Sequence, residues 1–184
     1  MTETDVLVLG GGAAGLMCAI TAANRGRRVI VLEGSNRVGK KILMSGGGRC
    51  NFTNLYCEPD RFLSHNPHFC KSALSRYTQH DFIALVEKHD IPYHEKTLGQ
   101  LFCDNSSKDI VAMLLRECDA ADVDIVTDCS IHSVDRDDGF VVRASSGDYR
   151  SESLVVATGG LSIPKMGATG FGYDLARQFG LHVY

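Results

Sequence analysis

The chain has 184 residues, a formal net charge of −3 at pH 7 and 44% hydrophobic residues, which is the composition of a globular protein with one domain, or one domain and a fragment of another. The near-neutral charge argues against a nucleic-acid partner, because nucleic-acid binders usually carry a basic face. No apolar run approaches the roughly 18 residues of a membrane span. No signal peptide is visible, so we expect a cytoplasmic protein without a membrane span.

The first expected elements form a strand–helix–strand unit. Residues 5–9 favour a buried strand because 6–9 are a continuous apolar run, residues 16–24 favour a helix, and residues 28–32 favour a second strand. A glycine-rich turn over residues 10–15 joins the first strand to the helix, and Glu33 closes the second strand. The whole unit has the size of one crossover between parallel strands.

Gly10, Gly12 and Gly15 have the G-x-G-x-x-G spacing of a dinucleotide-binding turn. The first glycine permits the tight turn, the second lets a pyrophosphate approach the backbone, and the third lets the helix pack closely on the strand. The N-terminus of the helix offers N–H groups and partial positive charge to that pyrophosphate. Glu33 can accept hydrogen bonds from ribose hydroxyls and disfavours the 2′-phosphate of NADP, so FAD and NAD both remain open. The alternative is a tight turn that binds no ligand.

The middle of the chain is poor in glycine and mixed in pattern. After the second strand, residues 34–54 predict a long loop with little periodicity. Helices are expected at residues 81–89 and 110–118, and Ser106 with Asp109 resembles a capping box before the second of them.

Lys40, Lys41 and Arg49 surround three successive glycines that follow Ser45 within the expected loop. Such glycines can present a nest of backbone N–H groups to an anion or to the edge of a flavin. The alternative is a surface loop with solvated cations.

The last third of the chain predicts short strands. Four strand-like runs, from residue 123 onward, are separated by Asp-Gly and Ser-Gly turns and indicate an antiparallel meander that returns to a buried strand at residues 154–157. The A-T-G-G motif at residues 157–160 permits another close backbone approach, and residues 167–173 open a further helix. Taken alone, A-T-G-G could also be only a turn between a strand and a loop.

Cysteines and histidines form no recognisable site in the sequence. The seven cysteines contain no C-x-x-C pair, which fits reduced thiols. The set Cys57, His65, His68 and Cys70 matches no common structural metal site, so no metal is expected. Cys50 could be a reactive thiol or a packed one. The seven histidines have no partner motif, and the catalytic residues therefore stay unassigned.

Five motifs together resemble a known family: V-L-G-G-G-A-A-G-L at 8–16, S-G-G-G-R-C-N at 45–51, L-G-Q-L-F at 98–102, A-T-G-G at 157–160 and G-A-T-G-F-G-Y at 167–173. Over essentially its whole length the chain is similar to NAD(P)/FAD-dependent oxidoreductases of the aminoacetone-oxidase and bile-acid-inducible flavoprotein type. The resemblance implies an α/β fold, a Rossmann-like FAD-binding domain of the glutathione-reductase type with an antiparallel β-meander.

Members of that family are considerably longer than this chain. The resemblance therefore predicts that residues 1–184 are the N-terminal portion of the FAD-binding domain, truncated before the substrate domain, with residues 57–122 as a mainly helical excursion. By position, it puts the pyrophosphate at the glycine turn, the adenosine ribose at Glu33, the adenine at the backbone of Ile131, and the flavin near both lysines and the second glycine group. The implied cofactor-binding residues are Gly10, Gly12, Ala13, Ala14, Gly15, Glu33, Lys40, Lys41, Ser45, Gly46, Gly47, Gly48, Ile131, Thr158 and Gly159.

The function that the resemblance implies is hydride transfer between a small organic substrate and FAD, with NAD(P)H or oxygen as the other partner. The alternative from the residues is a non-catalytic module that binds a flavin or nucleotide. An NAD-dependent dehydrogenase with one Rossmann half is disfavoured, because a long loop and a meander stand where it needs a further strand–helix pair.

Overall fold

The computed structural model describes residues 1–162 and 169–183, so the expected helix-opening motif at 167–173 lies partly outside the described residues. The chain divides into two compact units. The first is formed by Met1–Lys41 together with Leu114–Tyr184, and the second by Ile42–Met113. Two helices, α2 (Lys40–Met44) and α5 (Ser107–Ala120), contain the boundaries.

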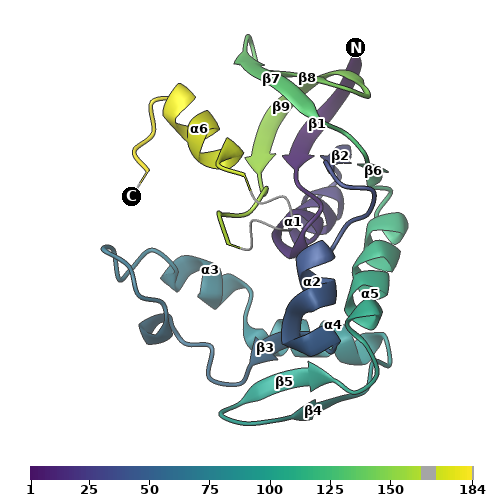
Figure 1. Cartoon of the computed structure of the whole chain (residues 1–184), viewed down its shortest axis with the longest axis vertical. Coiled ribbons are helices and arrows are strands. Elements are labelled where there is room, and N and C mark those ends of the chain that lie inside the picture. The colour runs from purple at the N-terminus through teal and green to yellow at the C-terminus, as the bar shows by residue number, and fades with distance from the viewer. Residues whose placement is uncertain (163–168, 184) are drawn as a thin grey trace. The chain divides into compact units, whose positions relative to one another are not determined.

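The first unit is built on a six-stranded sheet with the strand order β6-β2-β1-β9-β8-β7. Four neighbouring strands are parallel; β8 pairs antiparallel with β9, and β7 pairs antiparallel with β8 (Figure 1). The strands are β1 (Thr2–Leu9), β2 (Val29–Leu32), β6 (Asp124–Val126), β7 (Ile131–Arg136), β8 (Phe140–Ala144) and β9 (Gly147–Val156).

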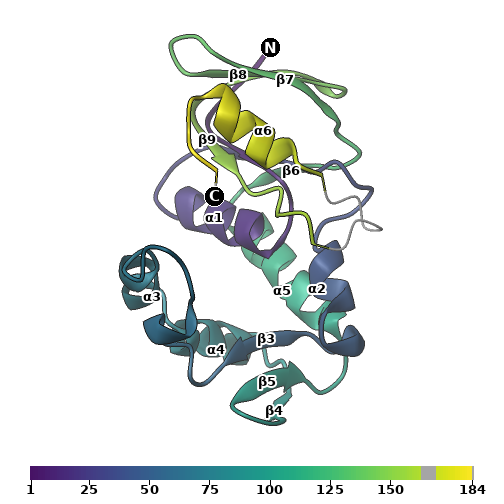
Figure 2. The same ribbon diagram turned by 60° about the vertical axis from the view of Figure 1, so that its left-hand side comes forward.

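Helices cover both faces of the parallel strands. Ala19 of α1 (Ala13–Ala23) shares a core cluster with Val8 and Val31, whereas Leu175 of α6 (Phe171–Gln178) shares another with Leu7. In both views α6 lies alongside β9 (Figure 2). Because successive side chains of a strand point to opposite faces, the apolar run of β1 is buried on both sides.

The α/β fold with an antiparallel meander is confirmed, and one detail of it is corrected. The prediction that residues 123–126 begin the meander is wrong, because β6 pairs parallel with β2 and puts Asp124 opposite Ile30. The meander consists of β7, β8 and β9. A short apolar strand has the same sequence pattern in either place, so its partner cannot be read from periodicity.

The second unit contains a small antiparallel sheet with the strand order β3-β5-β4. Around it lie two 3-10 turns and two helices. The elements are η1 (Ser45–Gly48), β3 (Asn51–Asn54), η2 (Pro59–Arg61), α3 (Lys71–Arg76), α4 (Gln79–Lys88), β4 (Tyr93–Glu95) and β5 (Gln100–Cys103). The expected featureless loop over residues 34–54 is therefore wrong, because it contains α2, η1 and β3.

The segment 57–122, expected to be mainly helical, holds β4 and β5 besides its helices. The assignment of residues 1–184 to one FAD domain stays a prediction. Within residues 1–162 and 169–183, no helix is long and apolar enough to cross a membrane.

Leu7 tests the buried parallel strands. Its side chain is 0% exposed at the centre of β1, whereas Leu181 in the same unit is 64% exposed. We expect Leu7→Ala to lower the free energy of unfolding by about 2–5 kcal/mol, since it removes buried methyl groups and leaves a cavity. Leu181→Ala should change it by less than about 0.5 kcal/mol. Urea unfolding measures both, and equal effects would contradict the described core.

Candidate functional site

The turn after β1 lies against the ends of two neighbouring strands. Gly10 has a φ of +107°, and its N–H donates to the Leu32 carbonyl at 2.8 Å. A Cβ added at Gly10 would lie 2.5 Å from the Ala157 carbonyl oxygen and 3.0 Å from the Cα of Thr158. A side chain therefore has no room at Gly10, and the turn is in direct contact with the A-T-G-G segment.

The other two glycines of the motif have opposite surroundings. A Cβ at Gly15 would collide with the Gly10 carbonyl oxygen, which is why helix α1 can pack so closely behind the turn. A Cβ at Gly12 would meet no atom within 4 Å. Gly12 caps α1 without a side-chain hydrogen bond, and Ala13 and Ala14 are exposed. The first helical turn thus presents backbone N–H groups, which have no acceptor within the helix, to open space.

Glu33 is tied to the same turn. Its Oε2 accepts a hydrogen bond from the N–H of Gly11 at 2.7 Å, and its Oε1 accepts one from the N–H of Ser35 at 2.8 Å. The backbone of Glu33 is bonded on both sides as well, to Val126 and Cys129. The carboxylate is half-buried, and each oxygen keeps a further lone pair for another donor.

Lys41, Thr158 and Gly159 lie together beside the end of β9. The Nζ of Lys41 donates to Ser162 Oγ at 3.1 Å and lies 3.1 Å from where a Cβ of Gly159 would stand. Thr158 Oγ1 is buried and lacks a hydrogen-bond partner among the described residues. A buried hydroxyl without a hydrogen-bond partner costs free energy, and no described residue supplies one for this oxygen. Lys40, the neighbour of Lys41, is half-buried.

Ile131 is the first residue of β7, where it faces Ala144 of β8 immediately before an irregularity of the register. Its side chain is partly buried against the core cluster that contains Leu7 and Leu9. The side chain therefore has a packing role, and contact of the Ile131 backbone with an adenine stays a prediction.

The residues from Ser45 to Gly48 belong to the second unit, where they form η1. Gly46, Gly47 and Gly48 have φ values of 57°, 66° and 89°, so all three are left-handed. Such a run costs roughly 1–2 kcal/mol per residue for any other amino acid. A Cβ at Gly46 would lie 2.6 Å from Phe102, whereas Gly47 and Gly48 face open space. Whether this turn meets a cofactor stays a prediction.

Cys50 follows this turn as a buried residue with a φ of +52°. Burial raises the pKa of its thiol, although a hydrogen bond with Ser45 acts in the opposite direction. Burial also raises the pKa of Cys103 to about 12, and the nearby Cys50 adds to that shift. These surroundings suppress the thiolate and favour the packing role for Cys50 over a reactive one.

One histidine has a partner that the sequence does not reveal. His94 Nδ1 lies 2.6 Å from Asp104 Oδ1, and both side chains are 43% exposed. The expectation that the histidines lack a partner motif is therefore wrong for His94. The two residues come together because β4 and β5 pair in antiparallel register, with His94 opposite Phe102. The only available signal was the pair of short strand-like runs around a Leu-Gly turn.

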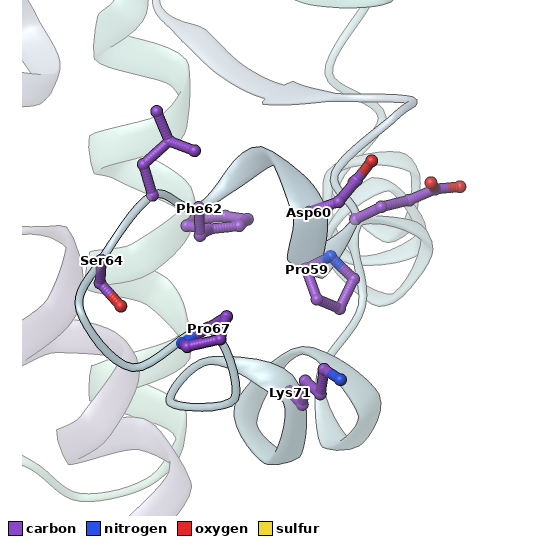
Figure 3. A pocket seen from close by; sticks show the side chains of 8 residues that line it. Pro59, Asp60, Phe62, Ser64, Pro67 and Lys71 are labelled. Carbon is purple, nitrogen blue, oxygen red and sulfur yellow. The ribbon is translucent and has the colours of Figure 1, made fainter.

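The described residues hold no group of three or more His, Cys, Asp or Glu side chains that could bind a metal ion. A cavity of about 560 Å³ lies within the second unit and is formed by one continuous segment (Figure 3). None of the predicted site residues lines it. Its lining residues are Glu58, Pro59, Asp60, Phe62, Leu63, Ser64, Pro67 and Lys71.

Comparison with protein families settles the affiliation of the chain. Residues 4–184 match the HI0933-like protein Rossmann domain. The chain belongs to this family. The agreement covers both the glycine turn with its acidic partner and the second unit.

Several relatives with assigned names are similar over nearly the whole chain. Ribosomal RNA dihydrouridine synthases from Escherichia coli (strain K12) and Haemophilus influenzae are 54% and 50% identical, over 100% and 98% of this chain and 46% of each relative. A 3-dehydro-bile acid delta(4,6)-reductase from Clostridium scindens is 29% identical over 94% of this chain and 43% of that protein. The HI0933-like chain thus spans about half the length of these relatives.

Solved structures share the fold. A 3-ketosteroid dehydrogenase from Rhodococcus jostii superposes with a TM-score of 0.65 at 17% identity, covering 87% of this chain and 46% of that one. A flavocytochrome c3 fumarate reductase gives 0.64 at 19% identity, over 96% and 40%. Glycine oxidase from Geobacillus kaustophilus gives 0.58 at 14%, over 100% and 60%. The chain therefore has the Rossmann-type FAD-binding fold of flavoprotein oxidoreductases.

These findings refine the resemblance seen in the sequence. The FAD-binding Rossmann family is confirmed, and a bile-acid reductase is among the relatives. The more similar relatives are named ribosomal RNA dihydrouridine synthases rather than aminoacetone oxidases. Those names do not support the expectation that the protein has no nucleic-acid partner.

Gly12 and Gly15 allow the two roles of the glycine motif to be separated. We expect Gly15→Ala to destabilise the fold by more than about 2 kcal/mol, because the new Cβ would strike the Gly10 carbonyl. Gly12→Ala should fold with nearly unchanged stability, since its Cβ enters open space. Thermal unfolding of the ligand-free chain tests both. A destabilised Gly12→Ala would show that this space is not open.

Three buried thiols with a raised pKa give a further test. Burial raises the pKa of Cys118 to about 11 and that of Cys103 to about 12, and it also raises that of Cys50. At pH 8 the thiolate of Cys103 is therefore about a thousandfold rarer than that of an ordinary cysteine. Iodoacetamide should label these three cysteines slowly, as peptide mass spectrometry would show. Rapid labelling of Cys50 in the folded chain would contradict the packing role.

Proposed function

We propose that the first unit binds FAD as the cofactor-binding part of a flavin-dependent oxidoreductase. The observation that carries this proposal is the hydrogen bond from the N–H of Gly11 to Glu33 Oε2 at 2.7 Å. It fixes the acidic residue at the end of β2 beside the glycine turn after β1. In dinucleotide-binding folds the same two places receive the ribose and the pyrophosphate.

The residues present fit such a cofactor on two counts. Gly12 faces open space at the N-terminus of an 11-residue helix, which suits the approach of a pyrophosphate to the backbone. Thr158 has its Cα beside Gly10 of the same turn, and its Oγ1, which lies near Gly172 of α6, is a buried hydroxyl without a hydrogen-bond partner among the described residues. A polar ligand atom at this place would remove the cost of leaving that hydroxyl unbonded.

The proposed roles of the chain's residues follow from this fit. The turn Gly10–Gly15 would bind the pyrophosphate and Glu33 the adenosine ribose, while Thr158 and Gly159 would close over the cofactor. Lys41, which lies beside Gly159, would balance the negative charge of the cofactor, and Lys40 would contribute a second positive charge. The contacts of Ile131 with the adenine and of Ser45–Gly48 with the flavin are part of the same proposal.

When bound, FAD supplies hydride transfer, and the protein contributes binding, orientation and charge. The substrate that we propose is a uridine of ribosomal RNA, whose C5=C6 bond would be reduced, with NAD(P)H as the electron donor. Support comes from two relatives of that name that are 54% and 50% identical to this chain. Because the chain spans only 46% of each of these relatives, the activity is proposed for the whole protein and not for this chain alone.

A second candidate is the reduction of a ring double bond in a small organic substrate. The bile-acid reductase from Clostridium scindens favours it, at 29% identity over 178 residues. Both reactions add hydride and a proton across a conjugated carbon–carbon double bond, so they make the same demands on the cofactor site. They differ in what must bind outside it.

Three measurements on one preparation distinguish these functions. After addition of FAD and removal of the unbound FAD by gel filtration, the purified protein should show a visible flavin spectrum, and NADH or NADPH should bleach it without oxygen. Ribosomal RNA from a strain without dihydrouridine should then gain that nucleoside, as mass spectrometry would show. A protein that stays colourless contradicts FAD binding. Binding without reduction favours the non-catalytic module, and reduction without RNA conversion favours a small substrate.

Thr158→Val provides a test that does not depend on activity. The change removes the unbonded hydroxyl and keeps the shape, so the ligand-free chain should be at least as stable. If the hydroxyl bonds the cofactor, the affinity for FAD should fall by about two- to tenfold in fluorescence titrations. Ser151→Ala is the matched control, because Ser151 Oγ is also buried without a described partner but lies in β9, away from the turn. Equal FAD affinity of all three proteins would refute the role of Thr158.

A further inference from the structure

One face of the small sheet carries an ordered group of aromatic and cationic side chains. His94 of β4 stands opposite Phe102 of β5, and the two rings are nearly parallel, with centroids 6.3 Å apart and planes at 20°. Lys96 Nζ lies 5.2 Å from the centroid of the same Phe102 ring. We call these three residues, together with Asp104, the His94 platform.

His94 and Lys96 are exposed, whereas the Phe102 ring on which they lie is buried. Phe102 is only 8% exposed and meets the glycine turn at Gly46, so it forms a firm base. Lys96 is exposed, and 43% of the His94 side chain is accessible to solvent. The hydrogen bond between Asp104 and His94 Nδ1 fixes the orientation of the imidazole. Ordering an exposed ring costs side-chain entropy. Because the hydrogen bond already orders the His94 ring, a second ring that stacks on it does not have to offset this cost.

We propose that the His94 platform binds single-stranded RNA, with a base stacked on the His94 ring and a phosphate bound by Lys96. Unpaired bases stack on aromatic and histidine rings, and cations beside those rings bind the backbone. Asp104 is a positioning residue that acts through His94. This inference deepens the proposed function and rests on it for the identity of the ligand as RNA.

The near-neutral charge of the chain is compatible with this surface. A net charge of −3 describes the sum over 184 residues, whereas a phosphate senses charge within about a Debye length, roughly 10 Å at moderate salt. Near Phe102 the acidic Asp104 is paired with His94, and the Lys96 ammonium lies over the Phe102 ring. Because Lys96 and Asp104 carry opposite charges, these two residues give the platform no net positive charge, and stacking on the His94 ring together with the Lys96 ammonium would favour RNA here.

The test is RNA binding by the FAD-loaded protein, measured as the fluorescence anisotropy of a labelled, uridine-rich, single-stranded oligoribonucleotide. His94→Ala should weaken binding by about five- to hundredfold, the range for loss of one stacked base. Lys96→Gln should lower the slope of log affinity against log salt by about 0.7, the share of one phosphate contact on a single strand. The matched controls are His132→Ala and Lys108→Gln, two exposed residues of the same types on β7 and α5.

A second measurement uses the unmodified protein and needs no substitution. Bound RNA should protect Lys96 from acetylation by acetic anhydride, whereas Lys108 should react equally with and without RNA. Weaker binding by His94→Ala and a smaller salt slope for Lys96→Gln, with both controls unchanged and Lys96 protected, support the proposal.

Unchanged binding in both variants, absence of RNA binding by the wild-type protein, or unprotected Lys96 overturns it. Failure of the proposed function looks different. In that case RNA binds through the platform, and no dihydrouridine forms in the ribosomal RNA assay.

Discussion

The structure of the first unit depends on how closely three strand ends approach one another. Gly10 donates its N–H to the end of β2 at Leu32, and its Cα lies so near the end of β9 that a Cβ would stand 2.5 Å from the Ala157 carbonyl. The parallel register of β2, β1 and β9 brings these three ends to one edge of the sheet. Ligands of open α/β sheets bind at that edge because the connecting loops separate there.

The same edge explains why charge and polarity gather where they do. Glu33 would be a poorly solvated carboxylate if the turn did not donate to it, and its two hydrogen bonds from backbone N–H groups replace water. Thr158 has no such compensation among the described residues. The acidic group thus has its hydrogen bonds within the chain, whereas the buried hydroxyl of Thr158 has none among the described residues.

In the second unit the glycine turn contacts an aromatic side chain. Its glycine turn is left-handed at three successive residues, and the ring of Phe102 occupies the space that a side chain at Gly46 would need. Glycine here serves packing within the small sheet, as well as any role toward a cofactor. The pairing of β4 with β5 then places His94 over Phe102 and beside Asp104. The glycine turn of the first unit thus shares its chain with an aromatic surface of unrelated geometry.

The sequence by itself determined the strand–turn–helix–strand unit, because its signals are local: an apolar run, three glycines at fixed spacing and an acid at the end of the next strand. That segment predicted a dinucleotide site and left FAD and NAD both open, and the resemblance carried by all five motifs implied the fold class and FAD. Only the tertiary structure decided which partner β6 takes, that residues 34–54 contain α2, η1 and β3, and that His94 meets Asp104. Strand pairing joins residues far apart in the chain, and short strands carry too few side chains to specify a partner through their pattern alone.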